Sequence, residues 1–71
     1  MIMRMKRANL IKEDGKYYFL IKSYKERNTE CRYCIDENTL EIGGEKVTKF
    51  PKFKNIVVFE NWCFRYIAEK L

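Results

Sequence analysis

Histidine does not occur in this 71-residue chain, and its absence removes the side chain that most often serves as a general base near neutral pH. The chain also lacks a G-x-S-x-G nucleophile motif, a glycine-rich phosphate loop and an H-E-x-x-H motif. Its two acidic pairs, Glu13-Asp14 and Asp36-Glu37, fall at expected turns, where water solvates the carboxylates. We therefore expect a protein that is not an enzyme and that uses no cofactor.

Long apolar runs are missing as well. No segment of 18 apolar residues occurs, and the N-terminal M-I-M-R-M-K-R lacks the apolar core and the small-residue cleavage site of a secretory signal. These features predict a cytoplasmic protein with no membrane partner. Thiols stay reduced in the cytoplasm, so three cysteines, an odd number, are poorly explained as a disulfide framework.

The C-R-Y-C pattern from Cys31 to Cys34 is the chain's closest approach to a metal or redox motif. A structural zinc ion needs four ligands, and beyond Cys63 the fourth would have to be a carboxylate such as Asp36, which is uncommon. Redox-active C-x-x-C pairs open a helix, whereas this pair lies in a strand-like segment, whose residues i and i+3 point to opposite faces. We expect no metal site, with Cys31 packed inward and Cys34 facing outward.

Alternating apolar and polar residues, punctuated by turn residues, predict a β-meander. Asp14-Gly15 and Gly43-Gly44 can each supply the positive φ angles of a tight hairpin turn. Pro51 ends the last arm, because proline cannot donate to a strand ladder. The β-branched run N-I-V-V-F, residues 55–59, adds a short buried strand. The other expected strands span residues 8–13, 16–24, 30–35, 40–42 and 45–50.

A helix is expected at the end of the chain. Asn61 is a good N-cap for a helix running to about Lys70, and an earlier start would push Glu60 into the apolar face. The sequence thus predicts an α+β fold, a small antiparallel β-meander of about four to six short strands with one C-terminal α-helix packed on it. It forms one basic domain over residues 1–71, with residues 1–7 as a candidate flexible arm. The helix presents an apolar stripe of Cys63, Phe64, Ile67, Ala68 and Leu71, and a second side of Trp62, Arg65, Tyr66 and Glu69.

Positive charge is concentrated in one half of the sequence. Residues 1–35 carry nine Lys or Arg and four Asp or Glu, whereas residues 36–71 carry six of each, so the whole net charge of +5 belongs to the first half. A field of one sign favours a polyanionic partner, which would be nucleic acid or an acidic protein surface.

The first candidate binding surface is the outer side of the second expected strand. Tyr17, Phe19 and Ile21 are assigned to the core, so the alternate positions point outward and Arg32 joins them from the next strand. Rings interleaved with cations can stack bases and neutralise phosphates, as in proteins that bind single-stranded nucleic acid. Strand propensity and surface solubility explain the same residues without a ligand. The predicted nucleic-acid-binding residues are Tyr18, Lys22, Tyr24 and Arg32, with Arg4, Lys6 and Arg7 from the arm. The lysines at positions 46, 49, 52 and 54 are expected to form a solvated face.

A second hypothesis is a protein-binding adaptor or inhibitor, for example an accessory protein of a mobile element or virus that docks on a larger host protein. Trp62, Arg65 and Tyr66 are residue types enriched in binding hot spots, although Trp62 could instead pack on the sheet. Because one sheet cannot readily cover both flanks of the helix, we also expect a homodimer with Trp62 at or beside its interface.

Overall fold

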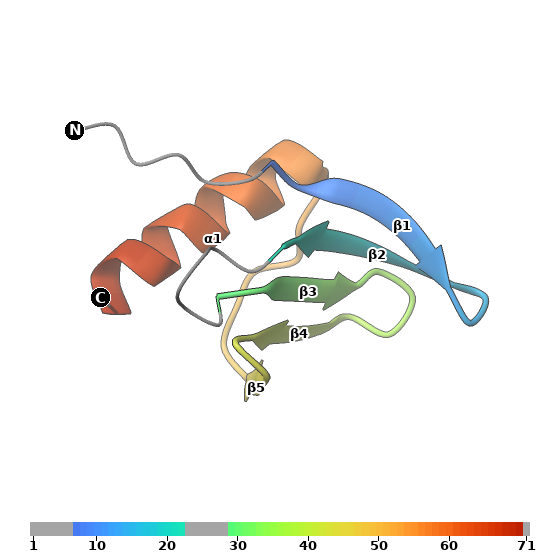
Figure 1. Ribbon diagram of the computed structural model, residues 1–71, viewed down its shortest axis with the longest axis horizontal. Coiled ribbons are helices and arrows are strands. Elements are labelled where there is room, and N and C mark those ends of the chain that lie inside the picture. The colour runs from blue at the N-terminus through green and yellow to red at the C-terminus, as the bar shows by residue number, and fades with distance from the viewer. Residues whose placement is uncertain (1–6, 23–28, 71) are drawn as a thin grey trace.

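The computed structural model describes residues 7–22 and 29–70 of the chain. In this part of the chain the strands form one antiparallel sheet in the order β1-β2-β3-β4-β5, so each strand pairs with its neighbour in sequence (Figure 1). The predicted α+β fold, an antiparallel meander followed by a C-terminal helix, is confirmed. The elements are β1 (Asn9–Glu13), β2 (Lys16–Ile21), β3 (Cys31–Cys34), β4 (Thr39–Ile42), β5 (Glu45–Val47) and α1 (Ile56–Lys70).

Two tight turns form the hairpins that the sequence predicted. Asp14 and Gly15 take φ values of 52° and 79° between β1 and β2, and Gly43 and Gly44 take 63° and 84° between β4 and β5. Positive φ at both central residues matches the twist of the flanking strands. The last strand ends at Val47 rather than at residue 50, because residues 48–55 leave the sheet as a connector to α1.

The helix begins at Ile56, so the strand predicted over residues 55–59 and the N-cap predicted at Asn61 are both wrong. Asn55 is the cap, since its Oδ1 accepts a hydrogen bond from the Val58 backbone N–H at 3.0 Å. The strand propensity of the β-branched run is overridden because the helix buries Phe59 completely. Glu60 does turn inward, but its carboxylate accepts a hydrogen bond from the Ala8 backbone N–H at 2.7 Å. The sequence argued against a helix start before Asn61 because Glu60 would then face the apolar side. This hydrogen bond compensates for placing the Glu60 carboxylate there.

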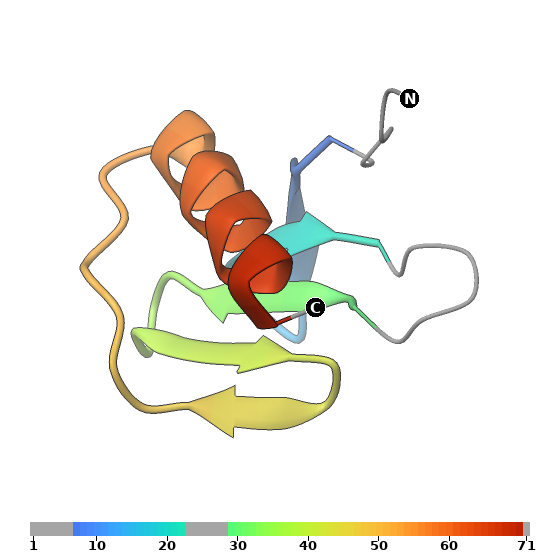
Figure 2. The ribbon, with the colours of Figure 1, turned by 90° about the vertical axis from the view of Figure 1, so that its left-hand side faces the viewer.

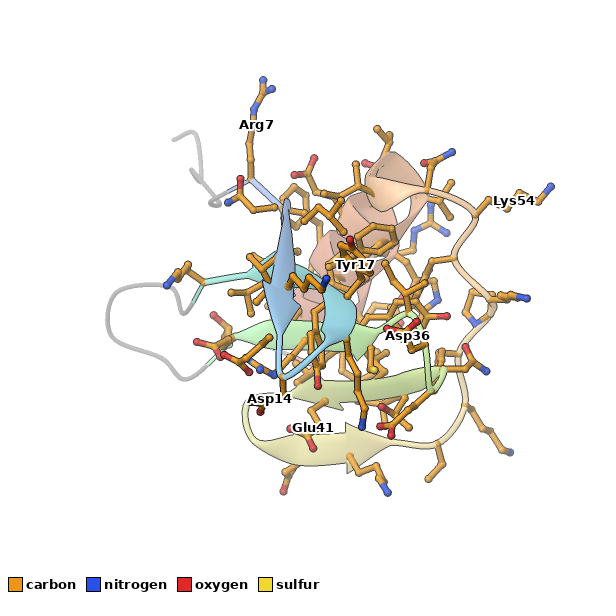
Figure 3. The ribbon with its side chains drawn as sticks, turned by 90° about the vertical axis from the view of Figure 1, so that its right-hand side faces the viewer. Arg7, Asp14, Tyr17, Asp36, Glu41 and Lys54 are labelled. Carbon is orange, nitrogen blue, oxygen red and sulfur yellow. The ribbon has the colours of Figure 1, made fainter. Side chains whose placement is uncertain are left out.

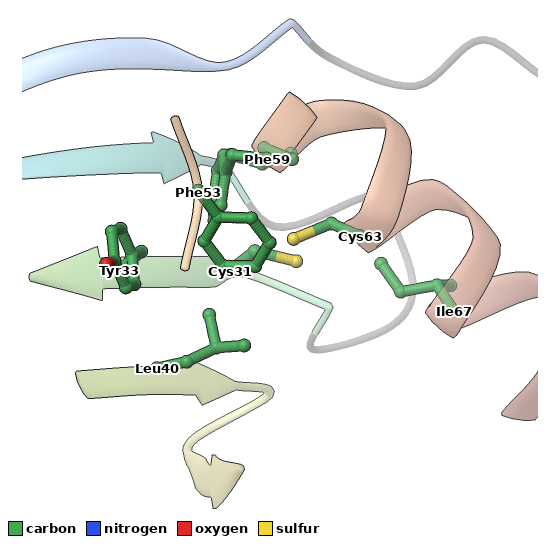
Figure 4. Packing of buried hydrophobic residues seen from close by; sticks show 8 residues of the cluster. Cys31, Tyr33, Leu40, Phe53, Phe59, Cys63 and Ile67 are labelled. Atoms are coloured by element: carbon green, nitrogen blue, oxygen red, sulfur yellow. The ribbon is translucent and has the colours of Figure 1, made fainter. Parts of the chain in front are cut away.

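The core lies between α1 and one face of the sheet (Figure 2). Phe59, Cys63 and Ile67, spaced four residues apart, form the buried stripe of the helix. Phe53 reaches the same core from the connector. The sheet contributes Ile21, Cys31, Tyr33 and Leu40 to this core. Figure 4 shows Cys31, Tyr33 and Leu40 on the strands that face the helix.

The buried side of α1 differs from the predicted apolar stripe, because it is centred on the line through Phe59, Cys63 and Ile67. Cys63 and Ile67 are buried as predicted, whereas Phe64 is only half-buried and Ala68 is exposed. Leu71 lies outside the described residues. The difference follows from the earlier helix start, which adds Phe59 to the apolar face. Within the described ranges, no helix combines the length and the apolar character needed to cross a membrane.

The opposite face of the sheet, which we call the outer face, also buries side chains. Strand alternation and cross-strand register place Tyr18, Leu20, Arg32 and Cys34 there. Leu20 is 6% exposed and Cys34 is 2% exposed. Cys34 thus lies on the side opposite Cys31, as the alternation predicted, yet it is buried, because Tyr18 on β2 packs beside it.

The two asparagines allow a direct test of where α1 begins. We expect Asn55→Ala to lower the free energy of unfolding by about 1 kcal/mol, because it removes the acceptor for the Val58 N–H. Asn61→Ala is the matched control, since Asn61 is exposed inside the helix and alanine has the higher helix propensity. Urea unfolding should therefore show a lower midpoint for Asn55→Ala and an equal or higher one for Asn61→Ala. The reverse order would contradict a helix that begins at Ile56.

Candidate functional site

The structure brings together two of the residues that the sequence predicted to bind nucleic acid. The guanidinium carbon of Arg32 lies 4.6 Å from the centroid of the Tyr18 ring on the outer face. Lys22 follows the end of β2 and Arg7 precedes β1, and both are exposed. Tyr24, Arg4 and Lys6 lie outside the described residues.

Two cations of the outer face are already matched by carboxylates. Arg32 pairs with Glu13, and the Lys16 Nζ lies 2.6 Å from the Glu37 carboxylate. That hydrogen bond and the charge of Glu37 raise the pKa of Lys16. Glu41 stands directly opposite Arg32 in the register of β3 and β4. A phosphate group would have to displace these carboxylates, so the outer face offers a poor anion site.

The Tyr18 ring is partly covered. One side of the ring faces Arg32, and the side chain is half-buried against β3. Burial raises the pKa of Tyr18, and the neighbouring Cys34 adds to the rise. The remaining ring surface lies beside a cation that Glu13 already pairs.

The connector carries positive charge that no carboxylate offsets. Lys49, Lys52 and Lys54 are all exposed, and the sequence has no Asp or Glu between Glu45 and Glu60. Among the residues that the structure describes, neither salt bridge involves a connector lysine. Lys54 projects outward from the connector in Figure 3. This segment is where the surface can best attract an anion.

A continuous row of aromatic rings runs from the connector onto α1, and we call it the aromatic ladder. The rings of Phe50 and Phe53 stack with centroids 5.9 Å apart. Phe53 meets Trp62 edge-on at 5.6 Å, and Trp62 stacks on Tyr66 at 5.1 Å with an interplanar angle of 20°. Phe53 is buried, whereas Trp62 and Tyr66 are half-buried. Trp62 and Tyr66 therefore keep part of their ring surface exposed on α1, although their stacking covers one side of each ring.

The structure also places the predicted interface residues on α1. Trp62 packs against the core through Phe53, so the connector covers part of the flank that the sequence left bare. Tyr66 lies one turn further along, and Arg65 is exposed beside it. Trp62 thus packs inside the fold, on the connector and not on the sheet alone.

Sequence reasoning missed Phe50 and Phe53 as parts of this surface. Residue 50 was assigned to a strand, and the nearby lysines were expected to be only a solvated face. The signal was present in K-F-P-K-F-K, residues 49–54, where cations and aromatic rings interleave around a proline. Sequence reasoning relies on the regular spacing of apolar residues in helices and strands, and this segment, which is neither, has no such spacing.

Within residues 7–22 and 29–70, no three His, Cys, Asp or Glu side chains gather closely enough to hold a metal ion. In the same part of the chain, every buried side-chain nitrogen or oxygen has a hydrogen-bond partner. What the connector and α1 present is positive charge and aromatic surface, which together suit a ligand with phosphates and planar rings.

No protein-family model, curated protein or solved structure shows significant similarity to the chain. The function must therefore be inferred from the residues of this surface.

Proposed function

We propose that the protein is a small non-enzymatic nucleic-acid-binding module that prefers single strands and acts in the cytoplasm. The observation that carries the proposal is that Lys49, Lys52 and Lys54 flank Phe50 and Phe53, the connector rings of the aromatic ladder, and that none of the three forms a salt bridge with a described residue. The proposal moves the binding surface from the outer face of the sheet to the connector and the adjoining side of α1.

Each part of this surface matches one part of a single strand. The lysines neutralise successive phosphates and release their counterions, which gives affinity without sequence preference. The half-buried rings of Trp62 and Tyr66 offer surface on which unpaired bases stack, each worth about 1–3 kcal/mol. Arg65 adds a cation on the same helix. A duplex keeps its bases stacked internally, so the rings favour a single strand.

Two matched triple variants separate the connector from the outer face. We expect Lys49→Gln, Lys52→Gln and Lys54→Gln together to weaken binding to a mixed-sequence DNA oligonucleotide at least about tenfold at low salt, because three phosphate contacts are lost. The plot of log affinity against log salt should also become shallower by about 2, at 0.7 per contact on single strands. Fluorescence anisotropy over a salt series measures both quantities.

The control removes the same charge from the outer face through Lys16→Gln, Lys22→Gln and Arg32→Gln. We expect it to leave the salt slope close to that of the wild type, because Lys16 and Arg32 already pair with carboxylates. A larger loss in this control than in the connector variant would return the site to Tyr18, Lys22 and Arg32. No binding by the wild-type protein at low salt would remove the nucleic-acid proposal.

Trp62 provides an internal probe, because it is the chain's one tryptophan. Stacking of a base on its ring should quench its fluorescence when a single-stranded oligonucleotide is added. A duplex of the same sequence should quench less, since its bases are paired. Tyr66→Leu keeps an apolar side chain beside Trp62 and removes one stacking ring, so it should weaken binding by about tenfold. Binding without any change in Trp62 emission would place the ligand elsewhere.

A second candidate is docking on another protein, as an adaptor or inhibitor. Val57 is 59% exposed in the first turn of α1 and Leu10 is 57% exposed in β1. The hydrogen bond between Ala8 and Glu60 ties these two elements together at this end of the molecule. Single exposed apolar side chains are common on protein surfaces, and it is a contiguous patch of them that marks a protein contact. A second copy of the chain is one such partner, so the homodimer stays a prediction.

Sedimentation equilibrium at high micromolar concentration tests self-association. Because Phe53 already packs on Trp62, we expect any dimer to depend more on the exposed side chains than on this ring. Leu10→Ser with Val57→Ser should then weaken the dimer more than Trp62→Phe does. The opposite ranking would support Trp62 at the interface, and a monomer mass for the wild type would contradict the dimer. A pull-down from nuclease-treated lysate distinguishes a protein partner from a nucleic-acid bridge.

A further inference from the structure

Two cysteines that lie far apart in sequence face each other in the core. Cys31 belongs to β3 and Cys63 to α1, and both side chains are completely buried. Figure 4 shows their sulfur atoms pointing toward one another across the space between strand and helix. The Cys31 Sγ donates a hydrogen bond to the Thr29 carbonyl oxygen at 3.5 Å, and the Cys31 side chain is close enough to Cys63 to perturb its titration. The sequence suggested only that these side chains fill space.

The third cysteine is excluded from this pair by strand geometry. Cys34 is three residues from Cys31 on the same strand, so its side chain leaves the opposite face of the sheet. Its cross-strand neighbours are Tyr18 on β2 and Thr39 on β4. The C-x-x-C spacing is therefore misleading, because the partner of Cys31 lies on the helix.

We propose that Cys31 and Cys63 form an oxidisable dithiol that a small disulfide, such as oxidised glutathione, converts into a disulfide bond between β3 and α1. One protein thiolate attacks a sulfur of the small disulfide, forms a mixed disulfide and releases one small thiol. The second protein thiolate then attacks the protein sulfur of that mixed disulfide and releases the other small thiol. The two protein thiols are oxidised, the small disulfide is reduced to two thiols, and both protons leave on them.

Burial controls the rate of this reaction. The interaction with the neighbouring Cys31 side chain and the loss of solvent raise the pKa of the Cys63 thiol well above its ordinary value. Little thiolate is present at neutral pH, and the oxidant reaches the sulfur only when α1 separates from the sheet. Brief exposure to oxidant therefore leaves the pair reduced. Once formed, the bond closes the loop over residues 31–63 and restricts the unfolded chain.

Tryptic mapping of the full chain tests the proposed disulfide independently of whether the protein binds nucleic acid. Cleavage after Lys and Arg puts each cysteine in a different peptide, namely residues 28–32, 33–46 and 55–65. The protein is incubated with oxidised glutathione at about pH 8.5, where more thiolate forms, and free thiols are then blocked in acid. We expect peptide 28–32 joined to peptide 55–65, with Cys34 free. A bond between peptides 28–32 and 33–46, or glutathione adducts alone, would overturn the proposal.

Three controls guard against a trivial result. The same oxidation in concentrated urea loses the native placement, so a urea map identical to the native one would count against the proposal. Cys34→Ser should give the same cross-link, whereas Cys63→Ser should give none.

The third control measures stability in the wild type alone, since Cys63→Ser could fail to fold. Oxidised protein should melt roughly 10 °C above reduced protein, and dithiothreitol should reverse the shift. An unchanged melting temperature would contradict a bond between strand and helix.

Discussion

The packing of α1 on the sheet depends on one buried tyrosine. Tyr33 lies in the central strand β3, and its ring meets Phe53 edge-on with centroids 4.9 Å apart. Phe19 on β2 and Phe59 on α1 lie within 6.2 Å of the same ring. Burial raises the pKa of Tyr33, and its hydroxyl donates to the Asn38 Oδ1 at 2.6 Å. Because sheet, connector and helix all contact this ring, its position fixes how the three parts fit together.

The placement of charge is the second constraint, and it cannot be seen by counting along the chain. The basic first half of the sequence folds against carboxylates from the second half, as when Glu37 pairs with Lys16. The second half has no net charge, yet its connector lysines are separated from its acidic residues by the fold. Figure 3 shows Asp36 in the turn between β3 and β4, and Glu41 on β4, away from Lys54 on the connector. The distribution of surface charge is therefore set by which residues the fold brings together, and not by the net charge of each half of the sequence.

Much of the fold could be predicted because its signals are local. Gly43-Gly44 and Asp14-Gly15 specify hairpin turns whatever surrounds them. Alternation assigns Phe19 and Ile21 to the core, but Tyr17, assigned there with them, is 45% exposed. The start of the helix could not be predicted, because Ile56 to Phe59 have strand propensity and only tertiary burial of Phe59 reverses it. The candidate site was equally hidden. Whether an aromatic side chain in an irregular connector is a core residue or a binding residue depends on the helix it packs against.

Strict pairing of neighbouring strands has a consequence for how the molecule assembles. Each pair of neighbouring strands from β1 to β5 joins residues that are close in the sequence. The loss of loop entropy on forming the sheet is therefore small. The contacts of α1 span a much longer separation, such as the one between Ala8 and Glu60. We expect the hairpins to form early and the docking of the helix to come late. The aromatic ladder crosses that last junction, so a partly folded chain would have its sheet and still lack the surface that the connector and α1 form together.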